Sequence, residues 1–149
     1  MPEEHHNYQM KAYAAKKVLN FLSKTCSCGA NEIILGVTNF DLYIPHSDLS
    51  GYLFGLAWKA GKVAVISTHR LHSQLPEKAH GPLLVERMTK EAMHELGHLS
   101  GLLHCHNTTC VMSVSRTAQA IDEKRSEYCL RCREHAAFRA DDYSVLSWI

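Results

Sequence analysis

The sequence predicts a mixed α/β (α+β) fold, in which a twisted mixed sheet lies beneath one long helix. Short apolar runs at residues 33–37, 51–56 and 62–67 predict three strands. Apolar side chains then recur every three or four positions through residues 82–101, which predicts the helix. Two close pairs of cysteines follow within residues 105–132. We therefore expect a sheet, a helix and a C-terminal region held together by its cysteines.

The chain has the size of one domain. Its 149 residues are 46% hydrophobic and 21% charged, which is ordinary for a globular protein with its own core. We find no repeat, low-complexity tract or long linker, so we expect residues 1–149 to form a single domain. The net charge of +1 argues against binding to nucleic acid or to an anionic membrane. No apolar run approaches the roughly 20 residues that span a bilayer.

The elements before the long helix follow from local patterns. Apolar positions at helical spacing predict a helix over residues 8–23. The uninterrupted apolar run at 33–37 predicts a buried parallel strand. Only a few residues separate the runs at 51–56 and 62–67, so we expect an antiparallel hairpin whose first strand is the edge of the sheet.

The long helix is predicted at about residues 82–101. Pro82 suits its first turn, where the N–H that proline lacks would have no partner. Gly101 can adopt a left-handed conformation and end the helix. We expect one stripe of apolar side chains to be buried: Val85, Met88, Ala92, Leu96 and Leu99.

The end of this helix carries the sequence HELGHLSGLLH, which matches HExxHxxGxxH throughout. His94 and His98 are four residues apart on one face, so both imidazoles can reach one metal ion. Glu95 lies about 100° around the helix axis, where it can touch a metal-bound water without binding the metal. A turn at Gly101 can bring back His104 as a third ligand. Three nitrogens leave one tetrahedral position open, which is typical of catalytic zinc.

Four cysteines in two close pairs match the ligands of a closed, structural zinc site. They are Cys105, Cys110, Cys129 and Cys132. Two disulfides or four unrelated buried thiols are the alternatives. The chain opens on MPEEHH, which is polar and unlike a secretory signal, so we expect a cytoplasmic protein with reduced thiols. That environment favours zinc. Cys26 and Cys28 have no second pair to join and are expected to be free thiols.

The stretch HELGHLSGLLHCHNTTCVM, followed by CLRC, resembles the archaemetzincin family of zinc metallopeptidases, a branch of the metzincins. The resemblance extends from about Ile33 to Cys132, and the cysteine quartet distinguishes this family from other metzincins. It implies that the three histidines bind catalytic Zn²⁺ and that Glu95 is the general base. It also implies that the four cysteines bind a second, structural Zn²⁺, and that Met112 belongs to a Met-turn. Many metzincins carry a tyrosine two residues after that methionine, whereas this chain has Val114.

The resemblance also raises a question about the start of the chain. Metzincins have a strand and a helix ahead of the matched region, and this chain begins at or just before a later helix. The sequence therefore predicts either a sheet without its usual first strand or a chain that has lost it.

The predicted function is zinc-dependent hydrolysis of peptide bonds by a monomeric enzyme. A peptide or protein substrate would add as a further strand to the exposed edge at residues 51–56. A zinc-stabilised binding or scaffold protein with a vestigial peptidase site is one alternative. A zinc module for nucleic acid is another, but basic and acidic residues interleave near the second cysteine pair, which favours a solvated helix face. The basic residues are Lys124, Arg125, Arg131, Arg133 and Arg139, and the acidic ones are Asp122, Glu123, Glu127 and Glu134.

Overall fold

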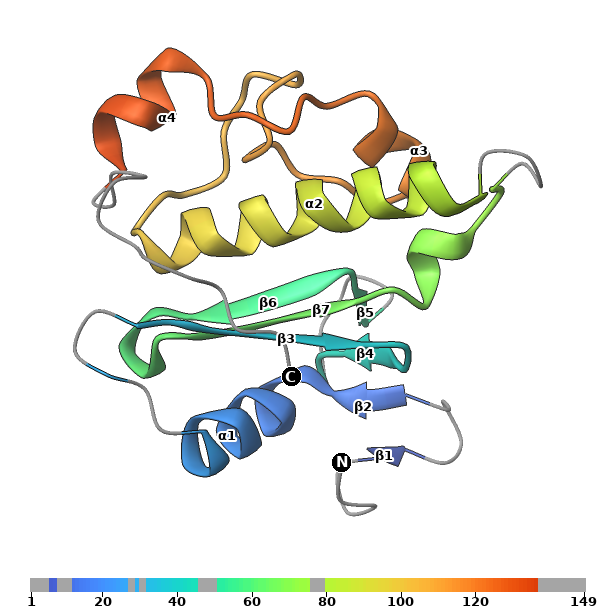
Figure 1. The fold of residues 1–149 in the computed structure, drawn as a ribbon, viewed down its shortest axis with the longest axis vertical. Helices are drawn as coiled ribbons and strands as arrows, with labels where there is room; N and C mark the ends of the chain where they lie inside the picture. Colours follow the sequence, from blue (N-terminus) through green and yellow to red (C-terminus); the bar gives the residue numbers. More distant parts are fainter. Residues whose placement is uncertain are drawn as a thin grey trace.

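The structure is a computed structural model that describes residues 6–7, 12–26, 29, 32–45, 51–75 and 80–136. Its elements lie in layers, with α1 below the sheet, the long helix α2 above it, and the C-terminal region above α2 (Figure 1). The helices are α1 (Ala15–Thr25), α2 (His80–Leu99), α3 (Ala118–Asp122) and α4 (Leu130–His135). No helix in these ranges is long and apolar enough to cross a membrane.

The strands beneath α2 form a mixed sheet in the order β3-β7-β6. They are β3 (Ile34–Thr38), β6 (Gly55–Trp58) and β7 (Val63–Ser67). Strand β3 runs parallel to β7, and β6 runs antiparallel to β7 at the edge. The predicted mixed sheet, with its antiparallel edge strand, is therefore confirmed. The prediction of a parallel strand at 33–37 is confirmed, but its predicted burial is wrong, because β3 occupies the opposite edge and is only partly buried.

A second sheet, ordered β1-β2-β4-β5, lies beside the first. It contains β1 (His6–Asn7), β2 (Ala12–Ala14), β4 (Asp41–Tyr43) and β5 (Tyr52–Leu53). The predicted edge strand at 51–56 is thus divided. Its first part pairs with β4, and only the part from Gly55 onward pairs with β7.

The start of the first helix differs from the prediction. Residues 12–14 share the apolar spacing of the helix, but they form β2, which pairs in parallel with β4 and is buried. The helix therefore begins at Ala15 rather than near residue 8. Strand β2 precedes this helix, but it belongs to the second sheet, and the described strands of the sheet beneath α2 all follow the helix. Long-range pairing with β4 decides the conformation of this segment, and local periodicity does not report it.

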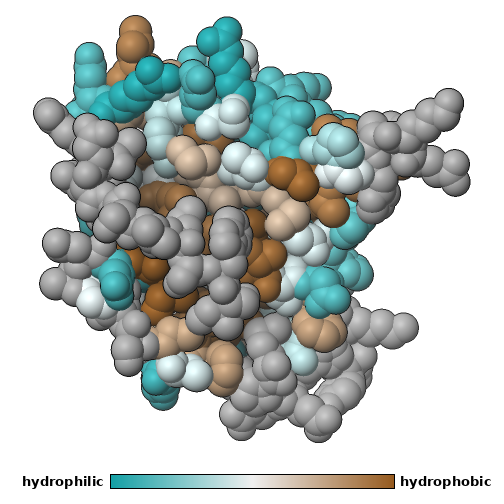
Figure 2. All heavy atoms as spheres, in the orientation of Figure 1, coloured by the Kyte–Doolittle hydropathy of each residue, from teal (hydrophilic) through white to brown (hydrophobic). Residues whose placement is uncertain are grey.

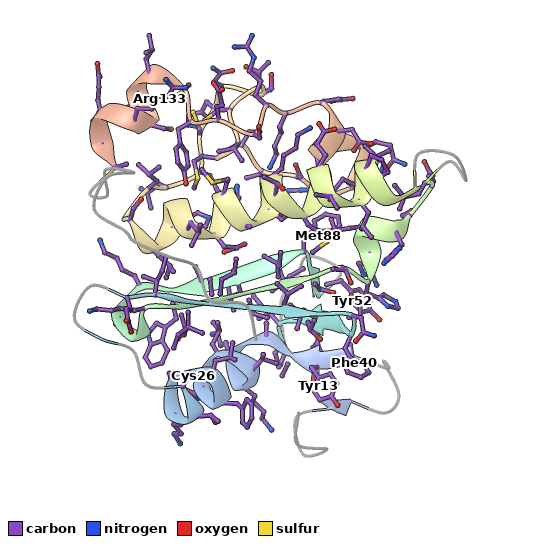
Figure 3. All side chains as sticks on the ribbon, viewed as in Figure 1. Tyr13, Cys26, Phe40, Tyr52, Met88 and Arg133 are labelled. Carbon is purple, nitrogen blue, oxygen red and sulfur yellow. The ribbon has the colours of Figure 1, made fainter. Side chains whose placement is uncertain are left out.

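The lower core packs between α1 and the sheets. Val18 and Leu19 of α1 contact Val63 and Val65 of β7 in one cluster of buried side chains. Tyr13 and Phe40 meet edge to face at 5.1 Å between ring centroids, at the same end of the molecule as Tyr52 (Figure 3). Figure 2 shows hydrophobic residues gathered at the level of the sheet, whereas hydrophilic residues cover the C-terminal region. The sheets and α1 thus form a base on which α2 rests.

Helix α2 is buried on two sides rather than along one stripe. Met88 lies on the side facing the sheet (Figure 3), and Leu99 is buried, but Val85 is 62% exposed, contrary to the prediction. The other side buries charged residues, because the C-terminal region covers it. Arg87 is 1% exposed and donates to the carboxylate of Asp122 at 2.7 Å.

Candidate metal centre

The C-terminal end of α2 has the hydrogen bonds of a Schellman motif. The Leu102 N–H donates to Gly97 O at 2.9 Å, and the Gly101 N–H donates to His98 O at 3.0 Å. Gly101 has φ of +93°, the left-handed conformation that the sequence predicted for this position. The chain therefore reverses at Gly101, and His104 returns towards the helix.

The three predicted histidines come together around one point. The ligand nitrogens of His94, His98 and His104 lie within 4.8 Å of one another. Ring centroids of His94 and His98 are 4.7 Å apart, and those of His98 and His104 are 4.9 Å apart. His94 is buried and His104 is exposed, so the group opens to solvent on the His104 side.

The protonation of the two helical histidines points to a cation between them. His94 Nδ1–H donates to Val111 O, and His98 Nδ1–H donates to Leu102 O, both at 2.8 Å. A neutral imidazole with a proton on Nδ1 has a lone pair on Nε2. Burial lowers the pKa of His94 to about 3, which keeps its ring neutral.

The two Nε2 atoms are 3.1 Å apart, so two lone pairs face each other. Tetrahedral zinc with Zn–N bonds of about 2.0–2.1 Å would place two nitrogens roughly 3.3–3.4 Å apart. The donor set therefore fits Zn²⁺.

Glu95 lies beside this group, under the edge strand. Its side chain is buried, and the ideal Cβ position at Gly55 of β6 would be 2.6 Å from Glu95 Oε1. Burial, together with the nearby Glu91 carboxylate, raises the pKa of Glu95 to about 8. Within the described part of the chain the carboxylate has no hydrogen-bond partner. Glu95 is thus a carboxyl group that readily accepts a proton, and no hydrogen-bond donor of the described residues occupies its oxygens.

Met112 lies against α2 at Gly97, in a tight turn. Ser113 N–H donates to Cys110 O at 2.9 Å across this turn, and Met112 is fully buried. An added Cβ at Gly97 would collide with the Met112 sulfur. The absence of a side chain at Gly97 therefore lets the methionine lie against α2. Val114, where many metzincins have a tyrosine, is 54% exposed.

The four cysteines form a second group next to the first. Their sulfur atoms lie within 4.8 Å of one another. Cys105 Sγ is 3.8 Å from Cys129 Sγ, and Cys110 Sγ is 3.8 Å from Cys132 Sγ. A disulfide needs about 2.05 Å, so these pairs are not disulfides.

Four sulfurs at 2.3 Å from a central zinc would be about 3.8 Å apart, which is the separation found. A backbone hydrogen bond involving Cys132 lowers the pKa of the Cys129 thiol to about 7, which favours the thiolate that zinc binds. The group therefore fits a four-thiolate zinc site. Cys26, at the end of α1, is a free thiol as predicted, and Cys28 lies outside the described residues.

Comparison with known proteins identifies the family of this chain. The model of peptidase family M54 matches residues 2–137. The chain belongs to that family, the archaemetzincins. The archaemetzincin of Natronomonas pharaonis is 38% identical over 125 residues, which cover 81% of this chain and 69% of that protein. The archaemetzincin of Methanopyrus kandleri is 37% identical over 134 residues, covering 90% and 71% of the two chains.

Solved archaemetzincin structures have the same fold. The crystal structure from Methanopyrus kandleri matches with a TM-score of 0.76 at 36% identity, and covers 90% of this chain and 69% of that one. The structure from Archaeoglobus fulgidus, complexed with malonate, matches with a TM-score of 0.73 at 31% identity, and covers 90% and 75%. As a member of this peptidase family, the protein is a zinc metallopeptidase with a mixed α/β fold.

The fold of this archaemetzincin also changes the interpretation of the charged residues near the cysteines. No helix spans residues 123–129, because α3 ends at Asp122 and α4 begins at Leu130. Lys124 is 4% exposed, and Asp122 pairs with buried Arg87. The expected solvation is therefore wrong for Lys124, while Asp122 is partly exposed. The remaining described residues of the set are exposed, and Arg133 and Glu127 form an exposed pair. Arg139 lies outside the described residues.

Sequence reasoning missed Gly55, Gly97 and Lys124 as residues of the site. The two glycines carry no side chain whose chemistry could draw attention, and Lys124 is indistinguishable from its charged neighbours in the sequence. The position of Gly97 inside HExxH, one residue before a histidine, was the available signal. Gly55 gave none, because its importance depends on a contact between a strand and a helix 40 residues later.

Proposed function

We propose that this protein hydrolyses peptide bonds with a catalytic Zn²⁺ held by His94, His98 and His104, and with Glu95 as the general base. The observation that carries the proposal is the pair of Nε2 lone pairs 3.1 Å apart beside a buried carboxyl group. We include the described residues in one catalytic domain that acts as a monomer on a peptide or protein substrate.

In the proposed hydrolysis, Zn²⁺ would supply the Lewis acid and Glu95 would transfer the proton. A Zn²⁺ held by the three histidines would supply a Lewis acid for a peptide carbonyl and would lower the pKa of a water to about 7. Glu95 takes a proton from the attacking water and gives it to the leaving amine. Its burial supports this role, because a carboxylate with a raised pKa accepts a proton more readily at neutral pH. Val111 O and Leu102 O hold the His94 and His98 rings in the tautomer that leaves Nε2 free for the ion.

The cysteine group is proposed to bind a second Zn²⁺ that serves structure. Four thiolates close the coordination sphere and leave no position for substrate or water. Cys105 directly follows His104, and its N–H donates to Met112 O at 2.9 Å. A metal at the cysteines would therefore fix the segment that carries the third histidine.

The edge of β6 is proposed as the place where substrate binds. Among the strands of the described residues, β6 has a neighbour only on the β7 side, so its outer backbone groups can pair with an extended peptide. Gly55 lies over Glu95, which would bring a peptide bond on this edge close to the histidines. Main-chain pairing would give a broad side-chain preference. The divided strand restricts this surface to Gly55–Trp58.

The test is cleavage of a peptide library by wild type and Glu95→Ala, with zinc content measured for both. We expect wild type to cleave, and Glu95→Ala to lose cleavage by about 10²–10⁴-fold with two Zn²⁺ per chain retained. Glu127→Ala is the matched control, because this glutamate is exposed. Wild type that binds two Zn²⁺ but cleaves nothing would support the alternative, a zinc-stabilised scaffold, and would refute the proposed activity.

A further inference from the structure

The carbonyl oxygen of Val111 accepts two hydrogen bonds from opposite parts of the chain. His94 Nδ1–H of α2 donates to it at 2.8 Å, and the ammonium of Lys124 donates to it at 3.3 Å. Val111 lies between Cys110 and Met112, and all three are at most 1% exposed. The acceptor that orients the first histidine is therefore itself held by a buried lysine, which the proposed mechanism does not use.

Lys124 lies where its charge acts on both predicted metal groups. Its Nζ is 3.9 Å from Glu91 Oε1, and that oxygen has no hydrogen-bond partner within the described residues. Burial lowers the pKa of Lys124, and attraction to Glu91, Cys110 and Glu95 opposes part of this lowering. A buried ammonium needs such partners, since leaving water is costly for an unpaired charge.

We propose that Lys124 is a positioning residue for the histidine metal group. By donating to the Val111 carbonyl, it fixes the acceptor that sets the tautomer and ring orientation of His94. This inference rests on the proposed role of His94 as a ligand. The alternative is that Lys124 only neutralises Glu91 and contributes to stability alone. The two roles differ in what happens to metal affinity once the charge pair is removed.

The test measures binding of Co²⁺ and Zn²⁺ to the full chain. Co²⁺ at the cysteines gives thiolate charge-transfer bands that Co²⁺ at the histidines lacks, so the two groups are titrated separately. Direct partners of ligating histidines typically contribute 10–100-fold to affinity, and Lys124 holds such a partner, so we expect Lys124→Met to weaken metal binding at the histidine group by about 10-fold. The double variant Glu91→Gln/Lys124→Met removes both buried charges together, which folded proteins tolerate better than removal of one. It should fold and keep the loss of affinity.

Lys90→Met is the matched control. Lys90 is a buried lysine on α2 that pairs with Glu86 at 2.7 Å and donates to Asp122 O, and it has no hydrogen bond to Val111. We expect this variant to lose stability but to bind Co²⁺ at the histidines within twofold of wild type.

Three results would overturn the proposal. The first is unchanged histidine-group affinity in Lys124→Met or in the double variant, and the second is an equal loss of affinity in Lys90→Met. The third is a double variant that does not fold, since Lys124 would then serve the fold rather than the histidines. Wild type that binds no Co²⁺ at the histidines would instead refute the proposed function, and this inference with it.

Discussion

Substitution of Gly97 by alanine tests the contact between α2 and the turn that contains Met112. In most helix interiors this change is favourable, because alanine is about 1 kcal/mol better than glycine in helix propensity. Here the added Cβ would collide with the Met112 sulfur and lie 3.1 Å from both Met112 Cε and Tyr128 Cε1. Met112 is fully buried, so its side chain cannot move into solvent to relieve the clash.

The size of the effect follows from a comparison within the same helix. Gly81 is also in α2, and an added Cβ there meets nothing within 4 Å. Gly81→Ala therefore gains helix propensity without a clash. Gly97→Ala gains the same propensity but overpacks a filled core, which typically costs about 1–3 kcal/mol. We expect the free energies of unfolding of the two variants to differ by about 1–3 kcal/mol, with Gly97→Ala the less stable.

The assay is urea unfolding of both variants at one fixed free zinc concentration, because bound metal contributes to the apparent stability. Gly97→Ala/Met112→Ala supplies a further check. Removing the methionine side chain removes the clash, so the double variant should lose less than the sum of the single losses. A Gly97→Ala protein as stable as Gly81→Ala would refute the reasoning, since the collision with Met112 would then have no cost.

Three further predictions concern the metals, the base and the buried charges. A chelator should remove metal from the open histidine group before the closed cysteine group, and loss of the second metal should unfold residues 105–136, as followed by metal analysis and circular dichroism. Gly55→Ala, whose Cβ would be 2.6 Å from Glu95 Oε1, should displace the carboxylate and lower kcat by about 10²-fold with little change in Tm, and unchanged kcat would contradict this contact. Arg87→Met should lower the free energy of unfolding by about 3 kcal/mol in urea titrations, because it leaves buried hydrogen-bond acceptors without a donor. Arg133→Met should lower it by less than about 1 kcal/mol, because the ion pair of Arg133 with Glu127 is exposed.

Local spacing in the sequence predicted the parts of the site that depend on one helix and its end. Residues four apart on a helix share a face in any protein, so the proximity of His94 and His98 follows from geometry alone. A glycine free to adopt positive φ then permits the reversal that returns His104. The antiparallel relation of β6 and β7 was equally predictable, because so short a connection allows little else.

The tertiary structure alone decided which segments pair and which charges are buried. Residues 12–14 and 51–53 join strand β4, and neither pairing has a local signature, because a strand's partner can lie anywhere along the chain. Lys124 and Arg133 are both basic residues near the cysteines, yet one is buried against Val111 O and the other is exposed. Whether a side chain is buried depends on which distant segments pack over it, and the local sequence does not specify those segments. The sequence therefore determined the identity and spacing of the proposed metal ligands, and the packing of the C-terminal region over α2 determined which neighbours act on them.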